Sequence, residues 1–288
     1  RGPEKAVEEK PENKSESLTS LEALRSRRPS TFSSTDGLDD ESLHLGSELY
    51  AQHCANCHEG QVYKAPNSYW LGIMSAKNLY DTMTSGIMQE QASALSDQER
   101  RQIVEFLVQQ PFDEAFYEPS YTICEGEAAE FDSFSEQERT GWGSDTRRFV
   151  PPGVANLNKS DLPRLKLKWS FGFPGAMRAR SQPTVAMGAI FVGSQDGTVY
   201  ALDLGSGCVR WAFEASAEVR TGVVVAKHSS SGELVFFGDL IANIYALNAV
   251  TGELVWKQSA DNHHSATITG TPAFHDDRLY VPVSSLEV

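Results

Sequence analysis

The sequence predicts a small all-α domain followed by the blades of an all-β propeller. Three observations carry this prediction. A Cys-x-x-Cys-His run follows an amphipathic helical pattern early in the chain, and a block of short β-rich runs recurs at a spacing of about 45 residues in the second half. The composition also changes near residues 40 and 140. A length of 288 residues suits two ordinary domains.

The first segment, residues 1–40, is rich in Glu, Lys, Ser and Pro and has almost no aromatic side chains. Such a composition buries too little apolar surface to offset the entropy lost on ordering. We therefore expect a disordered tether. From residue 41 the pattern becomes helical, with Leu45 and Leu49 on one face, and Ser96 with Glu99 forms a capping box that opens a second amphipathic helix. These signals bound an all-α domain over residues 41–112.

The Cys-x-x-Cys-His run consists of Cys54, Cys57 and His58. Two thioether bonds to the vinyl groups of haem need two thiols about one helical turn apart, and the imidazole that binds the iron must follow at once. The alternatives are a redox dithiol or half of a zinc site. A zinc site needs two more ligands at similar spacing, whereas Cys124 and Cys208 are solitary and distant. We predict covalent haem c on Cys54 and Cys57, with His58 as an axial iron ligand.

The order of motif helix, loop, Gly86-x-Met88 and capped terminal helix resembles a class I cytochrome c domain. In that family the sixth iron ligand is a methionine in the loop ahead of the last helix, and Met88 matches it. A soft, neutral thioether stabilises reduced iron. Other residues remain open as the sixth ligand: Met83, Met74, His53 and His44.

Residues 113–140 are acidic and irregular, which predicts an inter-domain linker with some surface packing. Cys124 lies in this segment. In an oxidising compartment it can pair with Cys208, and a buried free thiol is the alternative. The sequence leaves both open.

The region 141–288 contains an internal repeat, because residues 191–203 return as residues 236–248. A period of this length with several apolar runs and tight turns indicates four-stranded propeller blades. The Asp196-Gly197 pair is a hairpin signal. The tryptophans that recur at intervals of 42 and 45 residues are expected to pack between neighbouring blades: Trp169, Trp211 and Trp256.

This repeat, Val-Tyr-Ala-Leu-Asp followed by Ser-Gly and then Trp, resembles the blades of pyrroloquinoline quinone (PQQ) dehydrogenases, which form eight-bladed propellers. The likeness is greatest to the cytochrome-fused members, the polyvinyl alcohol dehydrogenases and related quinohaemoproteins. Four stretches carry it besides the repeat: residues 141–143, 147–149, 165–175 and 278–285.

The resemblance implies that PQQ accepts a hydride from an alcohol or hydroxylated polymer. Electrons then leave singly through haem to an acceptor cytochrome or oxidase. Calcium accompanies the quinone in such enzymes. The catalytic base and calcium ligands match no motif in this chain, and the pair of adjacent cysteines found in many members is absent.

Arg180 and Arg220 stand at similar repeat positions, each just before an apolar inner strand, and Thr269 takes this position in the third unit. Guanidinium groups suit the carboxylates of PQQ. We therefore predict these three residues as quinone anchors. The alternative for each is a solvated loop charge or a turn residue.

The formal net charge of −14 excludes nucleic acid and anionic membrane surfaces as partners. No apolar run reaches the length of a membrane span. Haem is attached to such motifs outside the cytoplasmic membrane, so we expect a periplasmic or exported protein. The chain begins with Arg1 and holds fewer than three blades after Trp169. We therefore expect an N-terminal fragment that lacks a leader and is inactive alone.

Two functions of different class remain. The first is a periplasmic quinohaemoprotein oxidoreductase. The second is an electron-transfer cytochrome fused to a non-catalytic propeller that binds proteins or polymers, because fold alone does not license catalysis.

Overall fold

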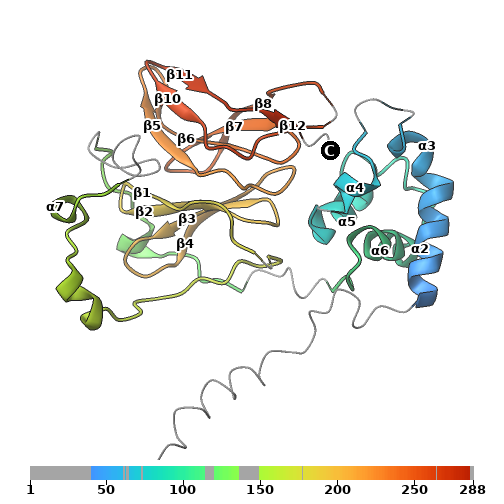
Figure 1. The fold of residues 1–288 in the computed structure, drawn as a ribbon, viewed down its shortest axis with the longest axis horizontal. Coiled ribbons are helices and arrows are strands. Elements are labelled where there is room, and N and C mark those ends of the chain that lie inside the picture. The colour runs from blue at the N-terminus through green and yellow to red at the C-terminus, as the bar shows by residue number, and fades with distance from the viewer. Residues whose placement is uncertain are drawn as a thin grey trace, which may run out of the picture.

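The computed structural model describes residues 40–60, 62, 65–72, 74–113, 120–135, 149–176, 178–263 and 265–285. Within these ranges a helical unit lies beside two four-stranded antiparallel sheets and two shorter strand pairs (Figure 1). The predicted fold class, helices followed by propeller blades, is confirmed. The 141–143 motif and the predicted tether lie outside the described residues, except for Asp40, the last tether residue, which begins α2.

The helical unit carries the Cys-x-x-Cys-His motif at the junction of its first two described helices. The capping box is confirmed, because Ser96 Oγ accepts from the Glu99 amide at 3.3 Å and Glu99 Oε2 accepts from the Ser96 amide at 2.7 Å. Its described helices are α2 Asp40–His53, α3 Ala55–His58, α4 Ser68–Leu71, α5 Ala76–Thr84 and α6 Asp97–Val108.

The two longest helices, α2 and α6, cross in direct backbone contact at Gly46. A Cβ atom at this position would lie 2.2 Å from the backbone oxygen of Gln102 and 2.8 Å from the Cβ of Phe106. Only glycine fits such an approach. The crossing closes one side of the core, in which Ile103 and Val104 of α6 are almost fully buried. Gly46 therefore fixes how α2 meets α6.

We expect Gly46→Ala to lower the free energy of unfolding of the helical unit by about 1–3 kcal/mol, the usual cost of overpacking. The added methyl group must push the α6 backbone away. Gly153→Ala is the matched control, because a Cβ there meets nothing within 4 Å. Urea unfolding followed by circular dichroism measures both variants, and equal midpoints would show that the crossing tolerates a side chain.

The β region contains two complete blades built on one plan. In each, four strands follow one another across the sheet in chain order, and all neighbours are antiparallel. This arrangement confirms the repeat read from the sequence. The strands of the first blade are β1 Thr184–Ala186, β2 Ala189–Gly193, β3 Thr198–Asp203 and β4 Val209–Glu214; those of the second are β5 Val224–His228, β6 Gly232–Gly238, β7 Asn243–Asn248 and β8 Leu254–Ser259.

The rest of the chain supplies shorter elements. The β10–β11 hairpin packs on the second blade, where the rings of Phe236 and Phe274 stack with centroids 5.2 Å apart. These shorter elements are η2 Gly126–Ala129, α7 Pro152–Ala155, η3 Lys159–Arg164, β9 Ala266–Thr267, β10 Ala273–His275, β11 Arg278–Tyr280 and β12 Ser284–Ser285, with β12 pairing to β9.

The recurring tryptophans pack between blades as predicted. Trp211 lies against Gly252 of the second blade and donates from Nε1 to the carbonyl of Ala249 at 3.0 Å. Trp169 repeats this contact one unit earlier, on Gly207 and the carbonyl of Leu204. Both glycines have positive φ, +71° and +76°, in turns where a side chain would also strike the indole.

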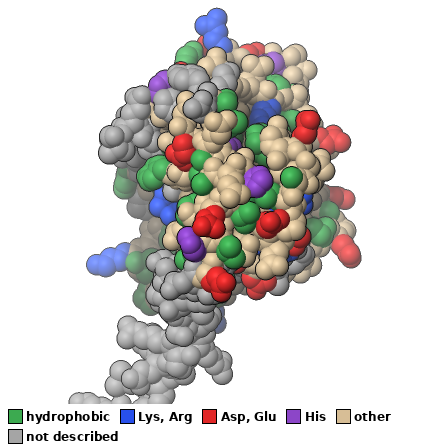
Figure 2. Space-filling model, turned by 90° about the vertical axis from the view of Figure 1, so that its right-hand side faces the viewer, with side chains coloured by type: hydrophobic (Ala, Val, Ile, Leu, Met, Phe, Trp, Pro, Cys, Tyr) green, Lys and Arg blue, Asp and Glu red, His purple; other side chains and the backbone are tan. Residues whose placement is uncertain are grey.

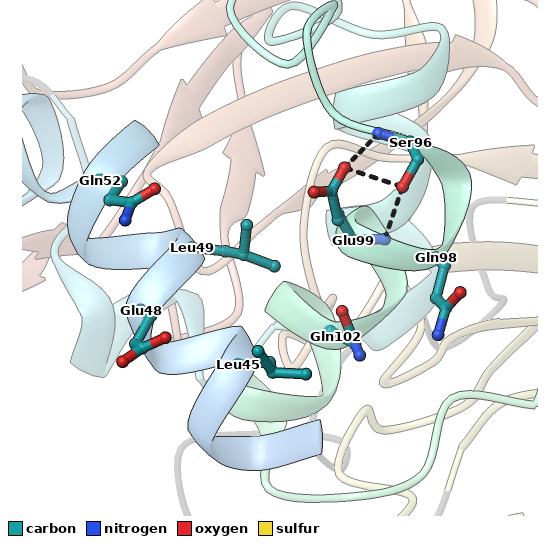
Figure 3. Close-up of a pocket in the computed structure, with 8 residues that line it drawn as sticks. All are labelled: Leu45, Glu48, Leu49, Gln52, Ser96, Gln98, Glu99 and Gln102. Carbon is teal, nitrogen blue, oxygen red and sulfur yellow. Dashed lines mark hydrogen bonds between the residues drawn. The ribbon is translucent and has the colours of Figure 1, made fainter. Parts of the chain in front are cut away.

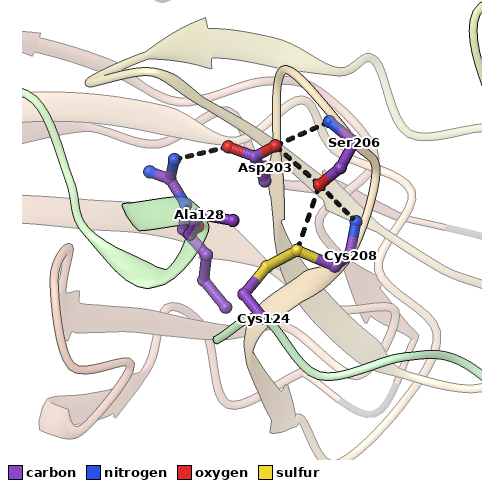
Figure 4. Close-up of a disulfide and its surroundings, with 6 residues drawn as sticks. Cys124, Ala128, Asp203, Ser206 and Cys208 are labelled. Atoms are coloured by element: carbon purple, nitrogen blue, oxygen red, sulfur yellow. Dashed lines mark hydrogen bonds and ion pairs between the residues drawn. A yellow bond between two sulfur atoms is a disulfide. The ribbon is translucent and has the colours of Figure 1, made fainter. Parts of the chain in front are cut away.

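The described part of the predicted linker, residues 120–135, packs on the first blade. Ile123 bridges Val209 of β4 in parallel, and a disulfide joins Cys124 to Cys208 with Cα atoms 5.1 Å apart (Figure 4). The structure thus decides the pairing that the sequence left open. Next to the disulfide, Arg210 forms a buried ion pair with Asp203 at 2.8 Å.

The Asp203 carboxylate gathers several partners in this corner. Burial acts to raise the pKa of Asp203, but hydrogen bonds from Ser206 and the ion pair with Arg210 hold it below its usual range. Arg210 also donates to the carbonyl of Ala128 at 2.8 Å. Segment 120–135 is therefore held to the blade by a covalent bond and by charged hydrogen bonds.

We expect the double variant Cys124→Ala, Cys208→Ala to lose about 2–4 kcal/mol of stability in the first blade, because the disulfide closes a long loop in the unfolded chain. Urea unfolding followed by tryptophan fluorescence measures the loss. Reductant should lower the stability of the parent by a similar amount and leave the double variant unchanged. A reductant effect in the double variant would mean that another bond is responsible.

In the part of the chain that the structure describes, no helix has the length and apolar character needed to cross a bilayer. The face of the helical unit turned away from the blades shows more acidic than basic side chains, interspersed with apolar ones (Figure 2).

Candidate haem site and arginine cluster

The end of α2 and the short helix α3 place the two thiols in a fixed helical geometry. The Cys54 amide donates to the Tyr50 carbonyl at 2.9 Å, and the amides of Cys57 and His58 donate to the Cys54 carbonyl at 3.1 and 3.0 Å. The two cysteines are therefore about one turn apart, and neither forms a disulfide. Cys57 is exposed and Cys54 is half-buried. Burial, helped by the nearby Cys57, raises the pKa of Cys54 to about 11.

The imidazole of His58 is oriented by a backbone oxygen. Its Nδ1 atom lies 2.6 Å from the carbonyl oxygen of Pro66. A carbonyl only accepts, so Nδ1 carries the hydrogen and Nε2 keeps its lone pair. A hydrogen bond of this kind orients the ring of a metal-binding histidine and makes it more basic. The ring therefore has the tautomer that an iron ligand needs.

A carboxylate that sequence reasoning missed fastens the loop after the motif. Glu59 Oε1 accepts from the Tyr50 hydroxyl at 2.7 Å and from the Ser68 amide at 3.2 Å. The hydrogen bond from Tyr50 lowers the pKa of Glu59, while burial and the neighbouring carboxylate raise the pKa of Tyr50. Glu59 follows the motif directly, and this adjacency is the one signal that pointed to it.

The methionine candidates for the sixth ligand all lie against the helical core. Met83 is buried on α5, whereas Met88 and Met74 are partly buried. Met88 follows the turn at Gly86, and its amide donates to the Thr82 carbonyl at 3.0 Å. The histidine alternatives, His53 and His44, are exposed on α2. The described residues hold no group of three or more His, Cys, Asp or Glu side chains that would suggest a different metal centre.

A groove of about 360 Å³ between α2 and α6 is not the haem site (Figure 3). None of the predicted haem-binding residues lines it. Its charged lining residues are the carboxylates Glu48 and Glu99, which would repel an anionic cofactor.

A second candidate site lies on the blades, where Arg220 and Arg178 form ion pairs with one buried carboxylate. Glu218 is 1% exposed, and its Oε2 atom accepts from Arg220 Nη2 at 3.0 Å. Arg178 lies 3.7 Å from the same carboxylate. The third arginine of this region is Arg180, whose pKa is lowered by burial and by the positive charges of Arg220 and Arg178.

The structure thus brings the predicted Arg180 and Arg220 together and adds Arg178 and Glu218, which the sequence analysis missed. The position of Arg178, two residues before Arg180, was the available signal. Thr269 is exposed, and within the described chain no hydrogen bond or ion pair joins it to the cluster. Three cations against one carboxylate leave an excess of two positive charges, which suits an anion. The donor set at Cys54, Cys57 and His58 would fit a haem, and the arginine cluster would fit an anionic group such as a carboxylate.

Buried hydroxyl groups hold the arginines in place. Ser181 Oγ donates to the Thr221 carbonyl at 2.7 Å and accepts from the Gly193 amide at 3.0 Å. Thr221 Oγ1 accepts from the Gly238 amide at 3.2 Å. Since Ser181 follows Arg180 and Thr221 follows Arg220, the same device anchors both arginines to their blades.

Comparison with known families adds a second line of evidence. Residues 130–286 match the PQQ-repeat family described as outer membrane protein assembly factor BamB, and this match covers more than half of the chain. The chain belongs to the PQQ-repeat propeller family. Residues 41–107 match the family described as cytochrome C oxidase, cbb3-type, subunit III. A cytochrome c domain therefore precedes the PQQ-type blades, as the sequence predicted.

The curated relatives of this PQQ-repeat protein are dehydrogenases. A polyvinylalcohol dehydrogenase of Pseudomonas sp is 32% identical over 264 residues, which cover 85% of this chain and 40% of that protein. A polyvinylalcohol dehydrogenase of Sphingopyxis sp. (strain 113P3) is 28% identical over 262 residues, covering 83% and 39%. The chain thus spans about two fifths of the length of these relatives.

A quinoprotein ethanol dehydrogenase of Pseudomonas aeruginosa is 32% identical over 145 residues, covering 48% of this chain and 23% of that protein. Among solved structures, a europium-containing methanol dehydrogenase aligns with a TM-score of 0.38 at 28% identity, covering 45% of this chain and 24% of that chain.

We expect Met88→Ala, in the haem-loaded protein, to lose the weak long-wavelength absorption band between sulfur and ferric iron, because the thioether that gives rise to it is removed. The optical spectrum of the oxidised protein measures this. Met74→Ala is the control and should keep the band. Loss of the band in Met83→Ala with retention in Met88→Ala would place the sixth ligand on α5.

Proposed function

We propose that this chain is the haem-bearing part, with the first PQQ-type blades, of a periplasmic quinohaemoprotein oxidoreductase that oxidises alcohols. The observation that carries the proposal is the order of the two units. The cytochrome match over residues 41–107 precedes the PQQ-type match over residues 130–286, and 85% of this chain aligns with a polyvinylalcohol dehydrogenase. The domain boundaries of the proposal are those predicted from the sequence: 1–40, 41–112, 113–140 and 141–288.

In this proposal Cys54 and Cys57 hold haem c through thioether bonds, and His58 and Met88 are its axial ligands. Haem supplies one-electron chemistry when bound. The chain's own contribution is orientation. The Pro66 carbonyl keeps the proton of His58 on Nδ1, and Glu59 ties the end of α2 to the start of α4 across the loop that carries Pro66.

The arginine cluster is the proposed quinone anchor of this chain. PQQ supplies two-electron chemistry and carries carboxylates, which Arg180 and Arg178 can bind while Arg220 is held by Glu218. Thr269 remains a proposed neighbour from its repeat position alone. The substrate class is an alcohol or hydroxylated polymer, and the electrons go on to an acceptor cytochrome or oxidase.

The test uses the full-length protein that contains this chain, made in a host that attaches haem c and supplied with PQQ and calcium. We expect an added alcohol to reduce the haem, measured by optical spectroscopy. Arg180→Gln should weaken PQQ binding by about ten- to a hundredfold, the loss expected for a charged hydrogen bond. Arg164→Gln, exposed and paired only with Asp161, is the matched control.

A pyridine haemochrome spectrum should show covalent c-type haem in the parent, and Cys57→Ala should lose one thioether bond and shift that spectrum. If covalent haem is present but no alcohol across a panel reduces it, the second function is favoured. The description of the matched family as an outer membrane assembly factor supports that alternative, in which the blades bind a protein or polymer without catalysis.

A further inference from the structure

The cytochrome domain and the first blade touch through one side chain that neither site uses. Asn78 lies in the first turn of α5, and its Nδ2 atom donates to the backbone carbonyl of Asp196 at 2.7 Å. Asp196 belongs to the turn between β2 and β3, 118 residues away in the chain. This hydrogen bond joins two units that have separate hydrophobic cores.

The turn is built to present that carbonyl. The Asp196 carboxylate is engaged within the turn, accepting from the Thr198 amide at 3.1 Å and from its hydroxyl at 2.8 Å. Gly197 has φ +95°, and a Cβ on it would lie 3.0 Å from Asn78 Nδ2 and 3.1 Å from a backbone oxygen. The equivalent turn of the second blade has Ala242 at this position. Glycine thus stands in the turn that α5 approaches.

Charges on the two sides of the contact are complementary. Lys77, next to Asn78, interacts electrostatically with Glu214 and Asp196 on the blade. Burial acts to lower the pKa of Lys77, but its hydrogen bond to Asp81 and these carboxylates leave it raised. A cation on α5 therefore lies opposite acidic groups on the blade, which favours the same docked arrangement.

The same four-residue turn, 194–197, also holds the arginine cluster. The Val219 amide donates to the Ser194 carbonyl at 3.0 Å, and the Ala215 amide donates to the Gly197 carbonyl at 2.9 Å, so both ends of the loop that carries Glu218 are fastened to it. The Arg178 amide donates to the side chain of Gln195 at 3.1 Å. Asn78 therefore binds the blade at the same turn, 194–197, that is hydrogen-bonded to Arg178 and to the loop that carries Glu218.

We propose that the hydrogen bond from Asn78 to Asp196 is a docking latch that holds the cytochrome domain beside the arginine cluster, and that Asn78 is a positioning residue. The latch sets the distance between the arginine cluster and the haem motif. That this is a distance an electron crosses rests on the proposed function. The docking of the two domains through Asn78 does not depend on that function.

The test introduces one spectroscopic label. The four native cysteines are taken up by the haem and the disulfide, so Ser231→Cys, at an exposed turn of the second blade, gives a single free thiol for a nitroxide. Pulsed electron paramagnetic resonance then measures the distance distribution between nitroxide and low-spin ferric haem. In the parent we expect one narrow distribution, because the cytochrome domain has one docked position.

Asn78→Ala should lower the ratio of docked to undocked molecules about fivefold, the change expected for one lost hydrogen bond. Asn78→Asp should lower it further, because a carboxylate cannot donate to the Asp196 carbonyl and is repelled by the acidic side chains beside it. Thr84→Ala is the matched control on α5, since its hydroxyl bonds only within its own helix. It should keep the narrow distribution.

The haem reduction potential should be the same in all four proteins, whereas in the loaded full-length enzyme the rate of haem reduction should fall in the Asn78 variants at an unchanged alcohol KM. An unaltered distance distribution in both Asn78 variants would overturn the latch. If haem is absent from the parent, the proposed function fails instead. The latch is then decided by hydrogen exchange, in which residues 194–199 must exchange faster in Asn78→Asp than in Thr84→Ala.

Discussion

The redox chemistry proposed for this protein depends on the hydrogen bond between His58 Nδ1 and the Pro66 carbonyl. Without it the imidazole could carry its proton on either nitrogen and rotate, and the iron would compete with that proton for Nε2. The structure removes this freedom through Glu59, which ties the end of α2 to the start of α4 and so fixes the loop that carries Pro66. The haem motif therefore works as a helix end together with a fastened loop, and not as three residues alone.

In the blades, too, a local hydrogen bond sets the position of a functional side chain, and it recurs from one repeat to the next. A buried hydroxyl at the start of each inner strand bonds the backbone of its own blade and, in the first blade, the neighbouring one. Because this hydroxyl comes directly after an arginine in both repeats, stacking the blades brings Arg180 and Arg220 to adjacent positions. Two charges of the same sign tolerate this closeness because Glu218 is buried beside them.

Much of this architecture could be predicted from the sequence, where local patterns determine local structure. The capping box at Ser96 and the helical pattern from residue 41 depend on short-range spacing, the blade repeat depends on a regular period, and all three were confirmed. The sequence left the disulfide as one of two alternatives and missed Glu218 and Asn78, because all three depend on contacts between residues 40 or more positions apart. Thr269 is the reverse case, a residue predicted from its repeat position that has no hydrogen bond or ion pair with the arginines in the described chain.

The overall charge of −14 and the proposed binding of an anionic quinone are compatible because the two effects act over different distances. At physiological ionic strength the field of an exposed charge is screened within about 8 Å, so acidic residues on distant surfaces do little to a ligand on the blades. Within that range the cluster contributes three guanidinium groups against the single carboxylate of Glu218. The excess is also partly desolvated, and fewer surrounding water molecules strengthen its attraction for a carboxylate. In the proposed function, the acidic surface would repel other anions, while the arginine cluster would select the one that fits among its guanidinium groups.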